Sequence, residues 1–286
     1  MNLVKKIYKI LSPHYQTLFL EYPVKFKPRF GHGKPPHEML YNLINKYRDD
    51  YSALLKEFLN YKEIFSSVKV WNEETNTINP CWNNDFLPGL DIVALYSIIN
   101  KFKPKRYVEI GSGYSTKVAY KAIKDNSLST KIISLDPYPR AEIDQISGEI
   151  IRKPLEESNF EFIFDLKPND ILFIDNSHRI LPNSDATVFF TEIFPKIPKG
   201  VIVHIHDIYL PYDYPQFMCN RFYSEQYMLA AYLLANIDKY KPILPNYFIS
   251  KDSELKEILN PIWENLECKN VETHGGSFWL LVNWLN

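Results

Sequence analysis

The chain has 286 residues, of which 45% are hydrophobic and 15% aromatic, and its 33 basic residues nearly balance its 34 acidic ones. This composition predicts a globular protein with a full hydrophobic core, organised as one large domain or one and a half. The charge balance provides no broad positive field for nucleic acid or an anionic membrane. A small molecule is therefore the expected partner.

The cysteines and the apolar runs indicate where the protein resides. Cys81, Cys219 and Cys268 lie far apart and form no CxxC motif, which argues against disulfides or structural zinc and favours a reducing, cytoplasmic location. Residues 1–26 are basic and apolar, but lysines interrupt them and no small-residue cleavage site follows, so we do not expect a signal peptide. No uncharged apolar run of about 18 residues occurs, so no membrane span is expected.

Residues 1–100 are expected to form an accessory helical region. Between residues 36 and 61, apolar side chains recur with helical spacing along a stripe from Met39 to Tyr47. A loop rich in Pro, Gly and Asn occupies residues 79–91, and residues 92–102 predict a helix that leads into the second region. That second region, residues 101–286, is the expected cofactor-binding domain.

From about residue 105, short apolar runs alternate with helical patterns, which is typical of a parallel sheet in an α/β fold. Strands are predicted at 106–110, 131–135, 148–152, 170–174 and 200–206, with a helix after each of them except the third. Two later runs, at 241–250 and 277–284, are joined by a short helical segment. The last run is expected to return antiparallel at the edge of the sheet.

The stretch VEIGSGYST, residues 108–116, lies where the first predicted strand turns into a helix. Gly111 and Gly113 allow a tight turn with close backbone approach to a ligand, and the helix N-terminus supplies free N–H groups. Asp136 ends the second strand about 23 residues later, where a carboxylate can accept both hydroxyls of an adenosine ribose. The pair of features therefore predicts an adenosine-binding site.

The residues around the turn favour one adenosine cofactor over another. Thr116 stands where a dinucleotide fingerprint has its third small residue, and Glu109 directly before the turn would repel a pyrophosphate. A carboxylate there suits a ligand with an ammonium group, such as the amino-acid part of S-adenosylmethionine.

Four stretches, VEIGSGYST, LDPYPR, LFIDNSH and VHIHDIYLPYDYP, together resemble the class I S-adenosylmethionine-dependent methyltransferases, in particular a bacterial branch acting on small molecules. The likeness runs from about Trp82 to the C-terminus. It implies a Rossmann-like, seven-stranded, mostly parallel sheet with an antiparallel last strand. It also implies the following cofactor contacts: Glu109, Gly111, Ser112, Gly113 and Ser115 at the methionine part, Asp136 at the ribose and Glu156 at the adenine.

Polar side chains end the fourth and fifth predicted strands: Asp175 and His178 on one, His206 and Asp207 on the other. Neighbouring strands lie about 4.8 Å apart, so the four can converge on one site. In one role, Asp175, His206 and Asp207 bind a divalent ion while His178 removes a proton; a histidine ligand disfavours Mg²⁺ and favours Mn²⁺, Fe²⁺ or Zn²⁺. In the other, which we favour, His178 or His206 is a general base held by an aspartate, without a metal.

The loop after the fifth strand supplies Tyr209, Tyr212 and Tyr214, and Trp82 precedes the domain. These four aromatic residues are expected to face the methyl acceptor. The alternative is that they pack the two regions of the chain together. The sequence thus predicts O-methylation of a sugar or secondary metabolite. A hydroxylase-like enzyme and a catalytically silent binding protein on the same fold stay open as alternatives, as does a homo-oligomer.

Overall fold

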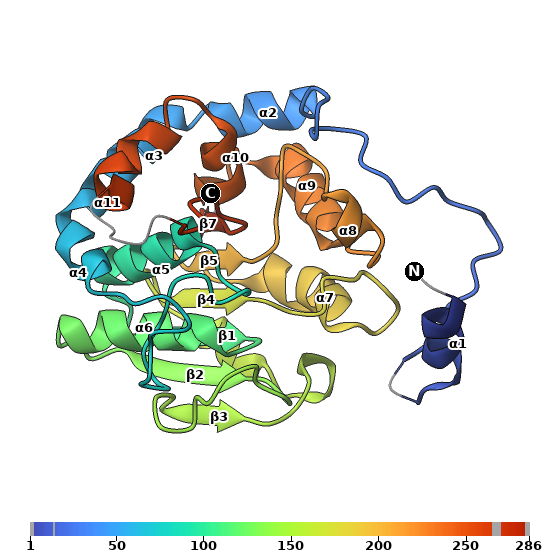
Figure 1. Ribbon diagram of the computed structural model, residues 1–286, viewed down its shortest axis with the longest axis horizontal. Helices are drawn as coiled ribbons and strands as arrows, with labels where there is room; N and C mark the ends of the chain where they lie inside the picture. Colours follow the sequence, from blue (N-terminus) through green and yellow to red (C-terminus); the bar gives the residue numbers. More distant parts are fainter. Residues whose placement is uncertain (1–2, 14, 265–269, 284–286) are drawn as a thin grey trace.

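The computed structural model describes residues 3–13, 15–264 and 270–283. Seven strands form one sheet in the order β3-β2-β1-β4-β5-β7-β6, with helices around it (Figure 1). This is the predicted Rossmann-like architecture. Cys268 and the last residue of the run predicted at 277–284 lie outside the described ranges.

Six of the seven predicted strands are confirmed with small differences in their ends, whereas the run at 241–250 forms a strand only as far as Pro245 and continues as a helix. The bounds of the strands are β1 (Arg106–Ile110), β2 (Lys131–Leu135), β3 (Glu149–Ile151), β4 (Ile171–Ile174), β5 (Ile202–Ile205), β6 (Tyr240–Pro245) and β7 (Phe278–Val282). Strands β1 to β5 pair in parallel, and β7 runs antiparallel to both β5 and β6. The two central strands β4 and β5 are buried at every position, as expected for a parallel sheet covered on both faces.

The last strand lies inside the sheet, which corrects one prediction. Strand β7 is antiparallel as expected, but it is inserted between β5 and β6, and β6 forms the edge. Proline has no N–H group to donate to a neighbouring strand, so it is tolerated at a sheet edge and not at its centre. Strand β6 carries Pro242 and Pro245, whereas β7 has the sequence FWLLV and can donate on both sides.

Eleven α-helices lie within the described residues: α1 (Leu3–Leu11), α2 (Glu38–Asn45), α3 (Arg48–Phe58), α4 (Lys62–Ser66), α5 (Gly89–Phe102), α6 (Tyr114–Asp125), α7 (Asp185–Val188), α8 (Gln216–Cys219), α9 (Glu225–Asn236), α10 (Asn246–Lys251) and α11 (Asn260–Glu264). The expected stripe from residue 39 to 47 lies on α2 except for Tyr47, which is the N-cap of α3, and Met39 on it is exposed. Residues 136–148, all described, form turns instead of the helix expected after the second strand.

Helix α5 connects the N-terminal helices to the sheet. It packs against α6, and the buried side chains of α2, α3 and α5 belong to the same hydrophobic cluster as those of the strands. The boundary placed at residue 100 falls inside this helix. No helix in the described ranges is both long enough and apolar enough to cross a bilayer.

The strand order also locates the site. Strand β1 lies between β2 and β4, so the connections that leave the carboxyl ends of β1 and β4 run in opposite directions along the sheet. In open α/β sheets, such a reversal leaves a crevice outside the strand ends, where ligands bind.

Candidate active site

The backbones that leave β1 and β4 approach each other closely at Gly111. Gly111 has a φ of +81°, and a Cβ built on it would lie 1.8 Å from the carbonyl oxygen of Asp175. Only glycine fits here, because a side chain would meet both unfavourable backbone geometry and a backbone atom. The contact fixes the predicted turn against the end of β4, where Asp175 begins the second group of predicted site residues.

Asp136 holds this turn through its carboxylate. Its Oδ2 accepts hydrogen bonds from the backbone N–H of Ser112 at 2.7 Å and from the Ser112 hydroxyl at 3.2 Å, and its Oδ1 accepts one from the N–H of Tyr138 at 2.7 Å. A carboxylate has about four acceptor positions, so these bonds leave room for a ligand hydroxyl. The structure therefore brings the predicted ribose ligand and the glycine turn together.

Glu109 lies beneath the turn and is fully buried. Its carboxylate accepts hydrogen bonds from the hydroxyls of Ser115 at 3.2 Å, Thr116 at 2.6 Å and Ser134 at 2.6 Å. Burial raises the pKa of Glu109 to about 7, although these hydroxyl bonds oppose the shift. In this arrangement Glu109 and Ser115 support the loop from below, and Thr116 caps α6 by accepting the N–H of Gly113 at 3.0 Å.

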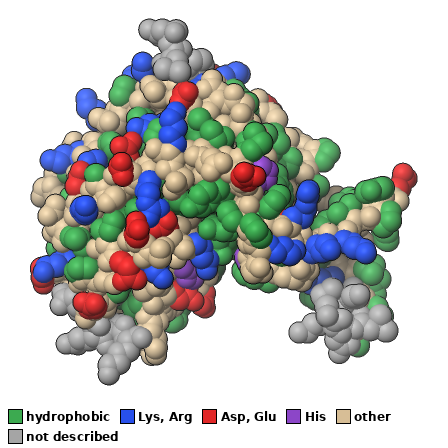
Figure 2. Space-filling model, turned by 90° about the horizontal axis from the view of Figure 1, so that it is seen from above, with side chains coloured by type: hydrophobic (Ala, Val, Ile, Leu, Met, Phe, Trp, Pro, Cys, Tyr) green, Lys and Arg blue, Asp and Glu red, His purple; other side chains and the backbone are tan. Residues whose placement is uncertain are grey.

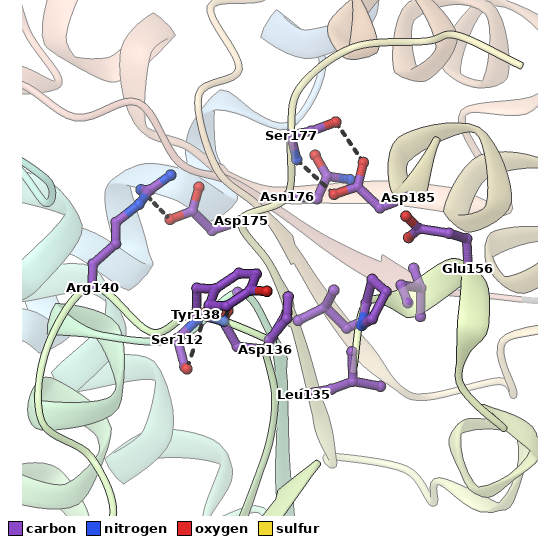
Figure 3. Close-up of a pocket in the computed structure, with 15 residues that line it drawn as sticks. Ser112, Leu135, Asp136, Tyr138, Arg140, Glu156, Asp175, Asn176, Ser177 and Asp185 are labelled. Carbon is purple, nitrogen blue, oxygen red and sulfur yellow. Dashed lines mark hydrogen bonds and ion pairs between the residues drawn. The ribbon is translucent and has the colours of Figure 1, made fainter. Parts of the chain in front are cut away.

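A cavity of about 350 Å³ opens beside the turn, a size typical of small-molecule sites (Figure 3). It is lined by Gly111, Ser112, Asp136 and Glu156 among the predicted cofactor residues, and by Asp175 at its far side. The buried Oε2 atom of Glu156 and the Nδ2 atom of Asn176, both at this cavity, have no hydrogen-bond partner. Unpaired buried acceptors and donors of this kind fit a polar ligand such as an adenine.

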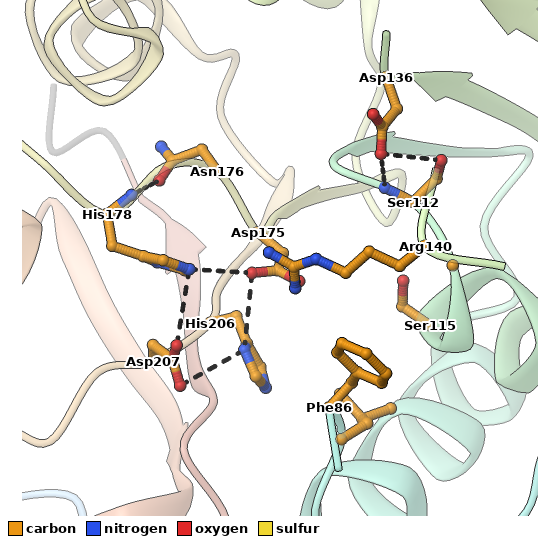
Figure 4. Close-up of polar contacts among 12 residues, drawn as sticks. Phe86, Ser112, Ser115, Asp136, Arg140, Asp175, Asn176, His178, His206 and Asp207 are labelled. Carbon is orange, nitrogen blue, oxygen red and sulfur yellow. Dashed lines mark hydrogen bonds and ion pairs between the residues drawn. The ribbon is translucent and has the colours of Figure 1, made fainter. Parts of the chain in front are cut away.

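A second cavity of about 370 Å³ lies on the other side of Asp175. Its walls combine His178, His206 and Asp207 with aromatic side chains, among them Phe86, Tyr209 and Tyr223. Arg140 lines both cavities, and its Nη1 lies 3.3 Å from Asp175 Oδ2. The two cavities are thus neighbours that share Arg140 as a wall, and Asp175 lies between Arg140 and the two histidines (Figure 4).

The predicted convergence of Asp175, His178, His206 and Asp207 is observed (Figure 4). His178 Nε2 lies 3.3 Å from Asp175 Oδ1 and 3.5 Å from Asp207 Oδ2. His206 Nδ1 lies 3.8 Å from Asp175 Oδ1 and 3.7 Å from Asp207 Oδ1. His178 and Asp207 adopt positive φ angles of 63° and 55°, a backbone conformation that non-glycine residues rarely adopt and that often marks functional positions.

Each imidazole faces a further buried carboxylate with its other nitrogen. His178 Nδ1 lies 2.5 Å from Glu225 Oε1, and the ring stacks on Tyr223. His206 Nε2 lies 3.3 Å from Asp91 Oδ2. Asp91 is held in turn by the side-chain amide of Asn246 and by two backbone N–H groups.

These contacts set the charge of the cluster. Burial alone would lower the pKa of His178, but the negative charge of Glu225 and the contact with Asp175 raise it well above its ordinary value. Burial opposes the charged form of His206 as well, yet the carboxylates of Asp207, Asp91 and Asp175 raise its pKa to about 9. The surrounding carboxylates therefore favour the protonated form of both rings.

The same contacts act on the carboxylates. Burial would raise the pKa of Asp175, but the hydrogen bond from His178 and the charge of His206 hold it below its ordinary range. A protonated imidazole cannot accept a proton, so these surroundings favour a carboxylate of the cluster over either ring as a proton acceptor. His204, by contrast, stacks on Phe173 inside β5, and burial lowers its pKa.

The predicted metal ligands do not form a metal site in this arrangement. Within the described ranges, no three His, Cys, Asp or Glu side chains are placed to hold a metal ion, and this includes Asp175, His206 and Asp207. The imidazole nitrogens that would bind an ion instead lie 3.3 to 3.8 Å from carboxylate oxygens of Asp175 and Asp207.

Of the four aromatic residues predicted to face the acceptor, one lines a cavity of the site. Tyr209 lines the second cavity. Trp82 is fully buried in the core against Phe65 and Trp263, so the packing alternative holds for it. Tyr214 is also fully buried, and Tyr212 packs on Tyr247 outside both cavities. These positions argue against direct contact of Trp82, Tyr212 and Tyr214 with an acceptor.

Three charged residues that contact the predicted cluster were not predicted from the sequence: Asp91, Glu225 and Arg140. Asp91 and Glu225 each stand in the first turn of a helix, α5 and α9. Acidic residues are common there because they interact with the helix dipole, so their position suggests no further role. Arg140 lies in the irregular segment after β2, which has no periodicity to interpret.

Comparison with known proteins identifies the region that contains this site. Residues 108–208 match the family described as Methyltransferase domain. This confirms the resemblance inferred from the sequence motifs. A protein of Archaeoglobus fulgidus described as uncharacterized is 30% identical over 95 residues, which span 31% of this chain and 43% of that protein. The match thus covers less than half of the relative's own length.

Three solved structures with similar folds are methyltransferases by their descriptions. The SAH-bound Podospora anserina methyltransferase PaMTH1 is 15% identical with a TM-score of 0.43, over 84% of this chain and 96% of that chain. The plantazolicin methyltransferase BpumL, with a triazolic desmethylPZN analog and SAH, is 14% identical with a TM-score of 0.45, over 87% and 100%. The O-methyltransferase from Bacillus cereus in complex with SAH is 14% identical with a TM-score of 0.38, over 86% and 99%.

The Gly111 contact yields the first prediction. Gly111→Ala should lower the free energy of unfolding by more than about 4 kcal/mol in urea titrations, because the new methyl group meets the Asp175 carbonyl. Gly33→Ala is the matched control: Gly33 also has a positive φ, of +91°, but a Cβ there meets nothing within 4 Å. It should cost only about 1–2 kcal/mol. Equal losses in the two variants would show that the close approach is unimportant.

The His206 environment predicts a pH-dependent stability. A pKa raised from 6.5 to about 9 stabilises the folded state below pH 6.5, and this stabilisation is lost as the pH rises through about 9. Between pH 7 and 8.5, His206→Gln should therefore make the decline in unfolding free energy shallower, by about 1.4 kcal/mol per pH unit. Urea titrations at several pH values measure this slope. An unchanged slope would mean that His206 is not protonated in the folded protein.

Proposed function

Residues 108–208 match the family described as Methyltransferase domain, and on that premise we propose that the protein transfers the methyl group of S-adenosylmethionine to an oxygen of a small molecule. The observation that carries the proposal is the pair of adjacent cavities at the strand ends, one beside the glycine turn and one beside the charged cluster. Both are of the size that small-molecule ligands occupy. A donor and an acceptor held there would meet at Asp175 and Arg140.

The first cavity fits the adenosine part of the cofactor. Asp136 keeps an acceptor position for a ribose hydroxyl, and the unpaired Glu156 Oε2 can accept from the adenine amino group. When bound, the cofactor supplies a methyl group activated by a sulfonium. Gly113, Ser115 and Arg140 line a small recess of about 10 Å³ beside the turn, and the methionine part would lie over it.

Arg140 is proposed to bind the carboxylate of that methionine part. Its guanidinium lines the recess and both cavities, and its side chain is half-exposed, so it can turn from Asp175 toward a ligand. Arginine pairs with carboxylates through two parallel hydrogen bonds, which gives orientation as well as affinity. Glu109 beneath the turn would favour the neighbouring ammonium group through its charge.

Asp207 is proposed to receive the proton of the acceptor hydroxyl. Both nitrogens of His178 and both of His206 face carboxylates, so Asp207 is the basic group of the cluster that opens into the second cavity. The two imidazolium rings hold it in place and stabilise its charge. The aromatic walls exclude water, which favours a reaction in which a nucleophile and a sulfonium neutralise each other.

Cofactor binding provides a test with two ligands. Arg140→Gln should weaken binding of S-adenosylmethionine at least about tenfold in calorimetry, since a charge-assisted pair contributes about 1.5–3 kcal/mol. It should leave 5′-methylthioadenosine unaffected, because this ligand keeps the adenosine and lacks the amino-acid part. Asp136→Ala should abolish the heat of binding for both ligands.

The two variants serve as controls for each other. Loss of both ligands in Arg140→Gln would show a general structural defect and contradict the assignment of Arg140. Binding of NAD in place of S-adenosylmethionine by the unaltered protein would contradict the cofactor assignment itself and favour a different activity on this fold.

The proposed base is tested by Asp207→Asn. This change keeps the shape and removes the proton acceptor, so transfer of label from methyl-labelled S-adenosylmethionine into an extract of small metabolites should fall about 100-fold or more. Cofactor binding should persist. Asp144→Asn, at an exposed site that lines neither cavity, is the matched control. Activity that is lost in EDTA and restored by Mn²⁺ or Zn²⁺ would contradict the metal-free role.

A further inference from the structure

The N-terminal arm, residues 3–26, is the least covered part of the described chain. It contains twelve of the twenty-one large hydrophobic side chains that the described residues expose. Leu11, Phe19 and Tyr22 are 77%, 85% and 79% exposed. In Figure 1 helix α1 stands apart from the body, and in Figure 2 the arm projects at the right, with hydrophobic and basic side chains on its surface. A contiguous apolar surface of this kind normally marks an interaction site.

The charge of the chain is segregated in the same way. Residues 1–29 contain six Lys or Arg and one acidic residue, whereas residues 30–286 contain 27 basic and 33 acidic residues. The near-zero net charge therefore conceals a basic arm on an acidic body. The charge balance led us to expect no positive field for an anionic membrane. That expectation holds for the chain as a whole and not for residues 1–29.

Helix α1 combines both properties. Ile7, Tyr8 and Leu11 are exposed and follow helical spacing along one side, and Lys9 is exposed on another. Further aromatic residues follow at Tyr15, Phe19 and Tyr22. A basic helix with an apolar face, followed by amphipathic aromatic residues, is suited to lie in the interface of a bilayer with its axis parallel to the surface.

We propose that this arm binds an anionic lipid surface and holds the protein there. A second copy of the chain would need an apolar surface to receive the arm. The remaining nine exposed large hydrophobic residues are distributed over several elements: Met39, Trp71, Phe86, Tyr138, Leu181, Phe217, Phe222, Tyr227 and Leu234. An anionic bilayer offers both a negative charge to pair with the lysines of the arm and an apolar interior to cover its hydrophobic side chains.

The root of the arm is fixed next to the second cavity. The backbone N–H groups of Arg29 and Phe30 donate to Asp213, at 2.5 and 3.0 Å, and the side-chain amide of Gln216 donates to the carbonyl of Phe26 at 2.7 Å. The Phe26 ring packs edge-on against Phe222, with centroids 4.7 Å apart. Phe217, Met218 and Arg221 of this same segment line the second cavity. A lipid surface held by the arm would therefore lie near the entrance of that cavity.

Vesicle co-sedimentation of the full chain tests the proposal. The protein should sediment with vesicles of 70% phosphatidylcholine and 30% phosphatidylserine, and much less with pure phosphatidylcholine, and added salt should weaken the binding. The variant K5E/K6E/K9E should bind the mixed vesicles about 100-fold more weakly, because each lysine near such a surface contributes about 1 kcal/mol. The variant I7D/L11D should lose binding even at low salt.

The matched control is K105E/K167E/K199E, which makes the same charge change at exposed sites on the body. It should bind like the unaltered protein, and binding of S-adenosylmethionine should be the same in all variants. Equal losses in the control and the arm variant, or equal binding to both kinds of vesicle, would overturn the proposal. The proposal would also be overturned if the protein bound no vesicles and light scattering showed a dimer that K5E/K6E/K9E converts to a monomer.

Discussion

The site depends on one close approach between two backbones. At Gly111 the chain leaving β1 passes the carbonyl of Asp175 with no space for a side chain, and this contact fixes the glycine turn relative to the end of β4. Asp136 then holds the turn from the side of β2. Because Asp175 stands between the two cavities, the same contact determines how far a ligand in one lies from a ligand in the other. Catalysis by approach and orientation requires such fixed spacing.

The charged cluster beyond Asp175 is stable only as a unit. Two imidazolium rings lie among four carboxylates, of Asp91, Asp175, Asp207 and Glu225, in a largely buried space. Removing one member would leave a buried charge without its partner, which is far more costly than the pair is favourable. The rings therefore act chiefly as fixed positive charges that orient the carboxylates, and only Asp207 combines this support with an opening to the second cavity.

The sequence predicted those parts of the protein that depend on local pattern. Seven strands, helices α5 and α6, the turn at Gly111 and the meeting of His178 with His206 all followed from apolar periodicity and from residues at strand ends. The position of β7 did not, because pairing within a sheet depends on which strands can donate, and the prolines of β6 decide this. Glu225 and Asp91 were missed because tertiary structure, and not spacing, brings helix starts to the cluster. The sequence left Trp82 open between the core and the site, since an aromatic residue in a loop fits a core and a cavity equally well.

The edges of the sheet limit how copies of this protein can associate. At one edge β3 has only three residues, and at the other Pro242 and Pro245 remove backbone donors from β6. A free strand edge is the usual template on which further chains add and fibrils grow. With one edge too short and the other poor in donors, continuation of the sheet from one molecule into the next is disfavoured. The protein can therefore expose an apolar arm at its surface without also offering a template for ordered aggregation.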